Sequence, residues 1–445
     1  MPKITHRKKR LSSFKLIVLG FAGVIVLGAL ILMLPFSSTA GVVTPFHEAL
    51  FTSTSAVCVT GLVVQDTGSY WSAFGQTVIL LLIQIGGLGV VTVAALFAML
   101  SGRKISLMQR STMQDAISAP KVGGIVRLTR FIVRGTFLIE LIGMIVMLPT
   151  FCGNYGFKGI WMAAFHSVSA FCNAGFDILG TAENKYPSLT GYIENPAINI
   201  AIMLLIIVGG IGFLTWDDIY TNKWHFKKYR MQSKVILVTT AILIIVPAVF
   251  FFFCDFTGLP LAERILASLF QSVTPRTAGF NTADLPAMTG SSKAIMTMLM
   301  LVGGSPGSTA GGMKTTTLAV LILSAFSVCR KKDDAEVCGR RIDGSAVKNA
   351  AAVAVMYFLL FFVGGIVIST AEGLPLSTCL YETASAVGTV GLTLGITPQL
   401  GVLSQLILIV LMYLGRVGGL TLIYAAVSNK NHSGAKLPLE KITVG

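Results

Sequence analysis

The sequence has few charged residues for its length. Asp, Glu, Lys and Arg make up only 12% of the 445 residues, whereas hydrophobic residues make up 54%. A water-soluble chain of this size needs far more charge on its surface, so the composition excludes a soluble protein. Apolar runs such as 16–36 and 201–214 reach or approach the roughly 20 residues that span a bilayer. The first run is too long for a signal peptide and lacks a cleavage site, so it predicts the first span of a polytopic membrane protein.

The chain also lacks clusters of residues that carry catalysis or bind metals. It has seven Cys and five His, and only Cys329 and Cys338 lie near one another, at a spacing that matches no zinc site. No cluster of His, Cys or carboxylates supports a catalytic site. We therefore expect no enzyme, no structural metal and no cofactor in this chain, and we interpret the cysteines as small apolar side chains.

Acidic residues are scarcer than basic ones, which gives a net charge of +15. Five segments (1–15, 101–134, 223–234, 330–348 and 430–445) hold 27 of the 34 Lys and Arg residues. Each of them abuts an apolar run, so they do not indicate nucleic-acid binding. By the positive-inside rule they are cytoplasmic, which places both termini on the cytoplasmic side of a cell membrane and pairs the spans between them.

One short pattern occurs four times between these basic segments. The four copies are FTSTSAVCVTGLV (51–63), FHSVSAFCNAGFD (165–177), FQSVTPRTAGFNT (270–282) and YETASAVGTVGLT (381–393). Each has an aromatic residue, a hydroxyl residue four positions later, and a Gly followed by an apolar residue. A spacing of 104 to 114 residues between these glycines fits two spans and a re-entrant half-helix per repeat.

We therefore predict an all-α fold with eight spans, in which four repeats of span, pore half-helix and span surround a pseudo-fourfold pore. The predicted repeats are 1–112, 113–232, 233–333 and 334–445. Non-helical backbone at membrane depth is tolerated where it lines a water-filled path. The alternative is that these glycines only allow close helix packing, which would not require an aromatic, a hydroxyl and a Gly in fixed order.

Backbone carbonyls can replace the water around K⁺ if the chain is extended and bent, and Gly permits the required conformations. The dipole of each half-helix would favour a cation at its carboxyl end. The repeats differ in side chains, so we expect an asymmetric filter. Its predicted residues are Cys58, Val59, Thr60, Gly61, Cys172, Asn173, Ala174, Gly175, Thr277, Ala278, Gly279, Gly388, Thr389, Val390 and Gly391.

Two features of the second spans predict a gate below this filter. Paired glycines recur at 83–89, 206–212, 301–307 and 414–420, but the third copy continues into GGSPGSTAGGMKTTT (303–317), which cannot hold a continuous helix. We expect this segment to line the cavity as a flexible plug. The alternatives are an ordinary loop and a phosphate-binding loop, but the spacing of its Gly and Lys residues does not match the phosphate-binding motif. The predicted gate residues of this segment are Gly303, Gly304, Ser305, Gly307, Ser308, Thr309, Gly311, Gly312 and Lys314.

Arg416 is the second feature. It lies in an apolar span 25 residues after Gly391. A charge at bilayer depth costs roughly 2.5 to 3.5 kcal/mol, so the side chain should face the pore, where it would oppose potassium accumulation. The alternative is that it snorkels to the cytoplasmic surface.

In combination these motifs resemble the Trk/Ktr/HKT superfamily of potassium transporters, most closely the membrane subunit of Ktr-type potassium uptake systems. The resemblance covers essentially the whole chain, including VTPRTAGFN (273–281), GTVGLT (388–393), GRVGGLT (415–421) and the tail LPLEKITVG (437–445). The second filter departs from the family pattern, because Cys172 stands where an Asn is common.

The resemblance implies a homodimer with one pore per subunit, above a cytosolic ring of RCK-type nucleotide-binding regulatory subunits. ATP or ADP on that ring would control the segment 303–317. It also implies potassium uptake into a bacterial cell, assisted by sodium in some members. In the family, a Gly at the position of Gly61 is associated with selectivity for potassium over sodium. The alternative is a proton- or sodium-coupled symporter of the Trk type with alternating access. No pair of acidic residues within the spans is evident as a proton relay, since Glu140 stands alone.

Overall fold

The computed structural model describes residues 12–101, 105–117, 123–419 and 421, and sixteen α-helices lie within these ranges. The basic segments at the two ends lie mostly outside the described residues, and the tail 437–445 does so entirely. The expectation of a mostly helical chain is confirmed, and several of its apolar helices are long enough to cross a membrane. The chain also contains a hairpin of two short antiparallel strands, β1 (Glu336–Val337) and β2 (Arg340–Arg341), which the sequence did not indicate.

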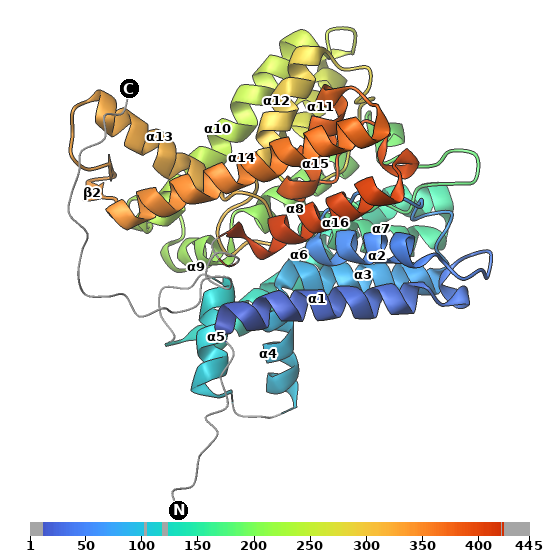
Figure 1. Ribbon diagram of the computed structural model, residues 1–445, viewed down its shortest axis with the longest axis horizontal. Coiled ribbons are helices and arrows are strands. Elements are labelled where there is room, and N and C mark those ends of the chain that lie inside the picture. Colours follow the sequence, from blue (N-terminus) through green and yellow to red (C-terminus); the bar gives the residue numbers. More distant parts are fainter. Residues whose placement is uncertain (1–11, 102–104, 118–122, 420, 422–445) are drawn as a thin grey trace, which may run out of the picture.

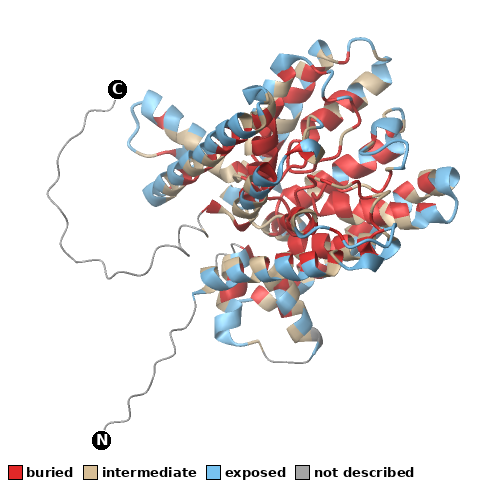
Figure 2. Ribbon diagram, turned by 45° about the vertical axis from the view of Figure 1, so that its right-hand side comes forward, coloured by how far each residue is buried: buried red, intermediate tan, exposed pale blue. Residues whose placement is uncertain are grey.

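Four long apolar helices open the four quarters of the chain, and each has the length and composition of a membrane span. They are α1 (Ser13–Leu32), α6 (Ile125–Tyr155), α10 (Met231–Cys254) and α14 (Gly344–Glu372). Their outer faces carry exposed apolar side chains, such as Leu19, Ile145 and Phe253. Figure 2 shows that exposed residues cover the outer helices while buried residues gather at the centre. A lipid-facing surface explains this distribution.

A short helix follows each long one, and these four pore helices have 13 or 14 residues. They are α2 (Phe46–Cys58), α7 (Lys158–Phe171), α11 (Leu261–Val273) and α15 (Leu376–Gly388). At 1.5 Å per residue each is roughly 20 Å long, which is too short to cross the bilayer. Pro45, Pro260 and Pro375 are the N-caps of three of them, and there a missing N–H costs no helix hydrogen bond.

A second helical segment completes each quarter, and only the third was expected to be interrupted. Helix α3 (Ala73–Leu88) meets α4 (Val90–Leu100) at 96°, and α8 (Pro196–Gly210) meets α9 (Phe213–Asn222) at 97°. In the third quarter a loop separates α12 (Gly290–Leu301) from α13 (Thr315–Cys329), and α16 (Val402–Val417) ends the fourth. Helices α4 and α5 (Leu107–Ile117) run across the direction of the main bundle (Figure 1). The remaining elements are the 3₁₀ turns Pro35–Ser37, Thr190–Tyr192, Phe226–Lys228 and Thr397–Gln399.

The quarters close into a ring through one repeated contact. The second helix of each quarter packs on the pore helix of the next: α3 on α7, α8 on α11, and α12 on α15. Helix α16 packs on α2, so the fourth quarter meets the first. This ring places the carboxyl ends of the four pore helices around one centre.

Candidate selectivity filter and gate

The backbone after each pore helix adopts the same conformation in all four quarters. The residue two positions before each filter Gly has a positive φ: 57° at Val59, 58° at Asn173, 65° at Thr277 and 53° at Thr389. The filter glycines Gly61, Gly175, Gly279 and Gly391 also have positive φ, from 67° to 95°. Positive φ is uncommon for residues other than Gly, and especially for a β-branched one. Three kinds of side chain, Val, Asn and Thr, therefore share this backbone conformation.

The hydroxyl residue of the repeated pattern ties this backbone to the pore helix. The amide before each filter Gly donates to the carbonyl of the hydroxyl residue, for example Thr60 N to Ser55 O at 2.8 Å and Ala174 N to Ser169 O at 2.7 Å. The pairs Ala278–Thr274 and Val390–Ser385 repeat this bond at 3.0 and 2.8 Å. The hydroxyl groups add further bonds: those of Ser55 and Ser385 accept from the filter Gly amides, and those of Ser169 and Thr274 donate to Phe176 and Phe280 carbonyls.

The four filter segments meet at their glycines. A Cβ atom built on Gly175 would lie 2.5 Å from the Ala278 carbonyl oxygen, and one on Gly279 would lie 2.5 Å from the Val390 oxygen. In the same cyclic order, a Cβ on Gly61 would collide with the Ala174 oxygen and one on Gly391 with the Thr60 oxygen. The carbonyls that precede the four glycines therefore lie close together around the centre.

This arrangement can bind a dehydrated cation. The amides of the same four residues are bonded to the pore helices, and their carbonyl oxygens lie against the neighbouring filter glycines at the centre. The buried hydroxyls of Thr60, Thr277 and Thr389 have no hydrogen-bond partner among the described residues and could add further oxygens. Rings of such oxygens replace the hydration shell of K⁺ in potassium channels.

The glycines of the second helices allow them to touch the pore helices. A Cβ on Gly86, Gly209 or Gly415 would collide with the carbonyl oxygen of Val57, Phe171 or Val387, respectively. Each of these carbonyls belongs to the residue four positions before a filter Gly. The paired glycines that the sequence shows thus serve close packing behind the filter, and the helix breaks follow at Gly89 and Gly212, with φ of 86° and 91°.

The segment between α12 and α13 lies directly against the inner side of the filter. Its Thr309 hydroxyl contacts the Asn173 side-chain oxygen at 3.0 Å and the Phe171 carbonyl at 3.2 Å. Ser305 N donates to Gly210 O at 2.9 Å, and Gly311 leaves no room for a Cβ beside the Thr389 side chain. The segment is therefore tied to the second and fourth filter segments and is not an outside loop.

Arg416 holds this segment to the first quarter. Its guanidinium donates to the carbonyls of Thr309 and Gly86, and to that of Gly87 at 3.3 Å. The expectation that it faces the pore side agrees with these contacts, and the snorkelling alternative does not. Lys314 Nζ donates to the Ala310 carbonyl at 2.8 Å.

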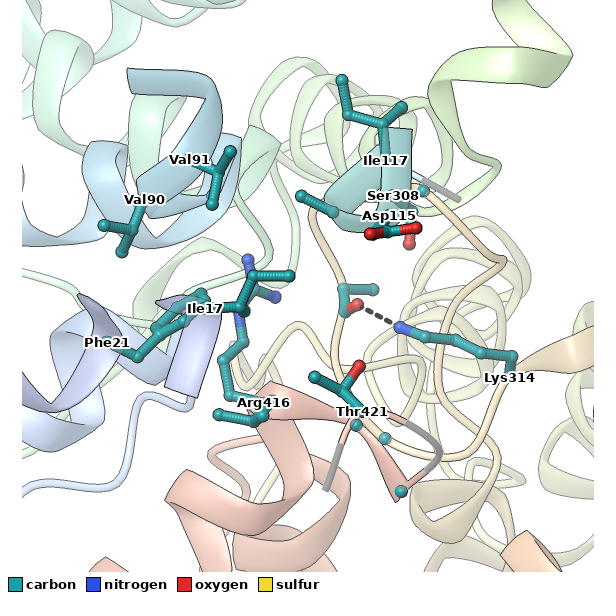
Figure 3. A pocket seen from close by; sticks show the side chains of 18 of the residues that line it. Ile17, Phe21, Val90, Val91, Asp115, Ile117, Ser308, Lys314, Arg416 and Thr421 are labelled. Atoms are coloured by element: carbon teal, nitrogen blue, oxygen red, sulfur yellow. Dashed lines mark hydrogen bonds between the residues drawn. The ribbon is translucent and has the colours of Figure 1, made fainter. Parts of the chain in front are cut away.

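Both cations line a cavity of about 230 Å³ on the inner side of the segment. Figure 3 shows Arg416 and Lys314 approaching it from different sides, with Ile17 and Phe21 of α1 and Asp115 of α5 on its walls. Asp115 was not expected, because α5 belongs to a basic segment that the sequence assigned to the cytoplasm. No repeated sequence pattern links α5 to the filter motifs, so only the fold shows that α5 lines this cavity.

Three more polar residues near the filter escaped sequence analysis. The buried Glu382 accepts hydrogen bonds from Thr397 Oγ1 at 2.9 Å and Leu394 N at 3.2 Å, behind the fourth filter segment. The Arg276 carbonyl accepts from Asn173 Nδ2 at 3.2 Å, which joins the second and third segments. Gln84 contacts Glu140 and Cys172.

The cysteines do not share one environment. All seven are free; Cys58, Cys172 and Cys379 are buried, but Cys254, Cys329 and Cys338 are exposed. The buried three fit the interpretation as small apolar side chains in a packed interior, whereas the exposed three lie at helix ends or in the hairpin. Within the described ranges, no group of three or more His, Cys, Asp or Glu could hold a metal ion.

Comparison with known proteins gives a consistent result. Residues 23–433 match the model of the TrkH family, described as cation transport proteins. The chain is 39% identical to the potassium/sodium uptake protein NtpJ of Enterococcus hirae over 98% of both chains. It is 37% identical to the Ktr system potassium uptake protein B of Bacillus subtilis over 92% of both.

A solved structure shares the fold. The potassium transporter TrkH from Vibrio parahaemolyticus superimposes with a TM-score of 0.75 at 19% identity, covering 96% of this chain and 87% of that one. The family match spans most of the chain and includes all four filter segments. The chain therefore belongs to the TrkH family of cation transport proteins, as the resemblance predicted.

Proposed function

We propose that this chain is the potassium-translocating subunit of a Ktr-type uptake system. The observation that carries the proposal is the ring of carbonyls before Gly61, Gly175, Gly279 and Gly391, all on one backbone template. Relatives over 35% identical are named as potassium or potassium/sodium uptake proteins. K⁺ is the proposed substrate, and sodium is a second cation to test as a stimulator or as cargo.

The proposed pathway has eight spans. Helices α1, α6, α10 and α14 are the first spans of the four repeats. The two bent pairs, the interrupted pair α12 and α13, and α16 would be the second spans. Both termini then lie in the cytoplasm of a bacterial cell, as the basic segments indicate.

The proposed gate is the segment 303–314 with Arg416. It lies between the filter and the inner cavity, and its contacts with Asn173, Phe171 and Gly86 hold it across the path. We further propose that the chain forms a homodimer and that a cytosolic ring of RCK-type subunits, carrying ATP or ADP, moves this segment. The name of the Bacillus subtilis relative, protein B of a Ktr system, indicates a multi-component system for that protein.

Substitution of Gly61 tests the filter. In Gly61→Ser the new Cβ would meet the Ala174 carbonyl, and the side chain would sit at a φ of 90°. We expect discrimination between potassium and sodium to fall, measured as the ratio of rubidium to sodium flux into proteoliposomes. Gly41→Ser is the matched control, because Gly41 has a φ of 67° with nothing within 4 Å. An unchanged ratio in Gly61→Ser would reject the filter assignment.

A further inference from the structure

Glu140 is a buried carboxyl group at the middle of α6 whose role the filter and gate do not explain. Its side chain is 5% exposed, and it takes part in none of the ion pairs among the described residues. Its side-chain partners are Gln84 Nε2, at 3.4 Å from Oε2, and Cys172 Sγ, at 4.0 Å from Oε1. An ionisable residue inside a membrane span indicates a functional role by default.

The three side chains form a closed triangle behind the second filter segment. Cys172 Sγ also lies 3.7 Å from Gln84 Oε1, so each member contacts the other two. They come from α3, from α6 and from the first filter position of the second quarter. The triangle therefore fixes the position at which the second filter segment leaves its pore helix.

The same thiol touches the backbone that holds the gate. A Cβ on Gly87 would lie 2.5 Å from Cys172 Sγ, so the thiol packs directly on this glycine. The carbonyls of Gly86 and Gly87 accept from Arg416. A shift of the Cys172 side chain would thus alter both the second filter segment and the backbone carbonyls that Arg416 contacts.

We infer that Glu140 is a positioning residue that sets selectivity by holding Cys172, an inference that rests on the proposed function. Support by a carboxyl group is specific to this quarter. Of the equivalent positions Cys58, Arg276 and Gly388, Arg276 bonds the Thr240 hydroxyl of α10 at 3.4 Å and Gly388 has no side chain to hold. Glu140 acts through Cys172 and touches no transported ion. Its hydrogen-bonding capacity matters in this role, and its charge does not.

The test compares ratios of rubidium to sodium flux in proteoliposomes for the full chain and a set of variants. E140A should lower the ratio about fivefold, the effect of a coupled contact of ordinary strength. E140Q should stay within about twofold of wild type, because an amide can still accept from Gln84. T129A is the matched control, since Thr129 is buried on the same helix and bonds only the Ile125 carbonyl of that helix.

The double variant separates positioning from general folding. If Glu140 acts through Cys172, E140A/C172A should be no worse than C172A alone, because coupled residues are not additive. Additive losses, an unchanged ratio in E140A, an equal loss in E140Q, or a change in total flux without a change in ratio would each overturn the inference. If E140A is not monodisperse in size-exclusion chromatography, Q84L removes the opposite partner and is judged by the same criteria.

Gly61→Ser, measured in vesicles of the same composition, distinguishes failure of the proposed filter from failure of the role proposed for Glu140. If it leaves the ratio unchanged, the proposed filter fails and this inference fails with it. If Gly61→Ser lowers the ratio while E140A does not, only the role of Glu140 is rejected.

Discussion

Each filter glycine meets two separate requirements, a positive φ and the absence of a Cβ. The first alone does not demand Gly, since Val59 and Thr389 hold φ of 57° and 53° in the same segments. A residue other than Gly in this conformation costs about 1 kcal/mol or more, which the bonds to Ser55 and Ser385 offset. The second requirement is absolute, because the neighbouring carbonyl occupies the space of the Cβ.

Gly391→Ala separates these two requirements. Its Cβ would collide with the Thr60 carbonyl, so we expect loss of potassium selectivity and a large fall in flux. Gly395→Ala is the matched control: it has nearly the same φ, 91° against 95°, but nothing within 4 Å. We expect the control to lose only about 1 kcal/mol of stability. The measurement is the ratio of rubidium to sodium uptake by each variant. Equal ratios in Gly391→Ala and Gly395→Ala would show that backbone strain matters and that the contact between the new Cβ and the Thr60 carbonyl does not.

At this scale the sequence predicted the residues that share a local pattern. The Gly and the hydroxyl four positions after an aromatic recur in order, and the structure joins them by hydrogen bonds. Gln84, Glu140 and Glu382 could not be predicted as neighbours of the filter. Gln84 contacts a carboxyl 56 residues away in the chain, and no local pattern encodes such a pair.

Among the elements, the second helices show why breaks are hard to locate from sequence. The segment 303–317 was predicted to be interrupted because its Gly, Pro and hydroxyl content excludes a helix. The breaks after α3 and α8 rest on one glycine each, Gly89 and Gly212. A single Gly in an apolar run is equally compatible with close packing, which is the role that Gly86 and Gly209 have. Only the fold distinguishes the two uses.

Release of the segment 303–314 from the filter should open the proposed path for ions. Thr309→Val keeps the side-chain volume but removes the hydroxyl that contacts Asn173 and Phe171. Loss of such buried bonds costs about 1–3 kcal/mol. We expect basal rubidium flux, without any partner subunit, to rise several-fold.

Thr297→Val is the control for this release. The Thr297 hydroxyl bonds the Lys293 carbonyl of its own helix, α12, outside the proposed gate, so its removal should leave basal flux unchanged. A shorter segment lacking 307–311 should raise flux further. If a monodisperse Thr309→Val protein conducts no faster than wild type, the contact with the filter does not restrain the path.

In the whole molecule, one repeated contact joins four similar quarters into a closed ring. The pattern of aromatic, hydroxyl and Gly indicated four copies around one centre, but not which helix would meet which. The structure shows each second helix on the next pore helix, with α16 on α2. Gly86, Gly209 and Gly415 pack on the pore helix of their own quarter, whereas Gly87 packs on Cys172 of the next one. The glycine pair of α3 therefore joins this helix to two filter segments.

The orientation of the pore in the membrane can be tested with two native cysteines. Cys254 ends α10, which begins within the basic segment 223–234, so the positive-inside rule places Cys254 outside the cell. The helix has 24 residues and is roughly 36 Å long, enough to cross the hydrocarbon core. Cys338 lies in the turn between β1 and β2, within the basic segment 330–348, and should face the cytoplasm. Both side chains are exposed.

Two variants that each keep one of these exposed cysteines, with Cys152 and Cys329 replaced by Ser, separate the two sides. A membrane-impermeant maleimide added to intact cells should label the protein that keeps Cys254 and spare the one that keeps Cys338. Permeabilised cells should show labelling of both. The buried Cys58, Cys172 and Cys379 should react in neither condition. Labelling of Cys338 from outside would invert the assigned orientation, and the cavity lined by Lys314 and Arg416 would then open away from any cytosolic partner.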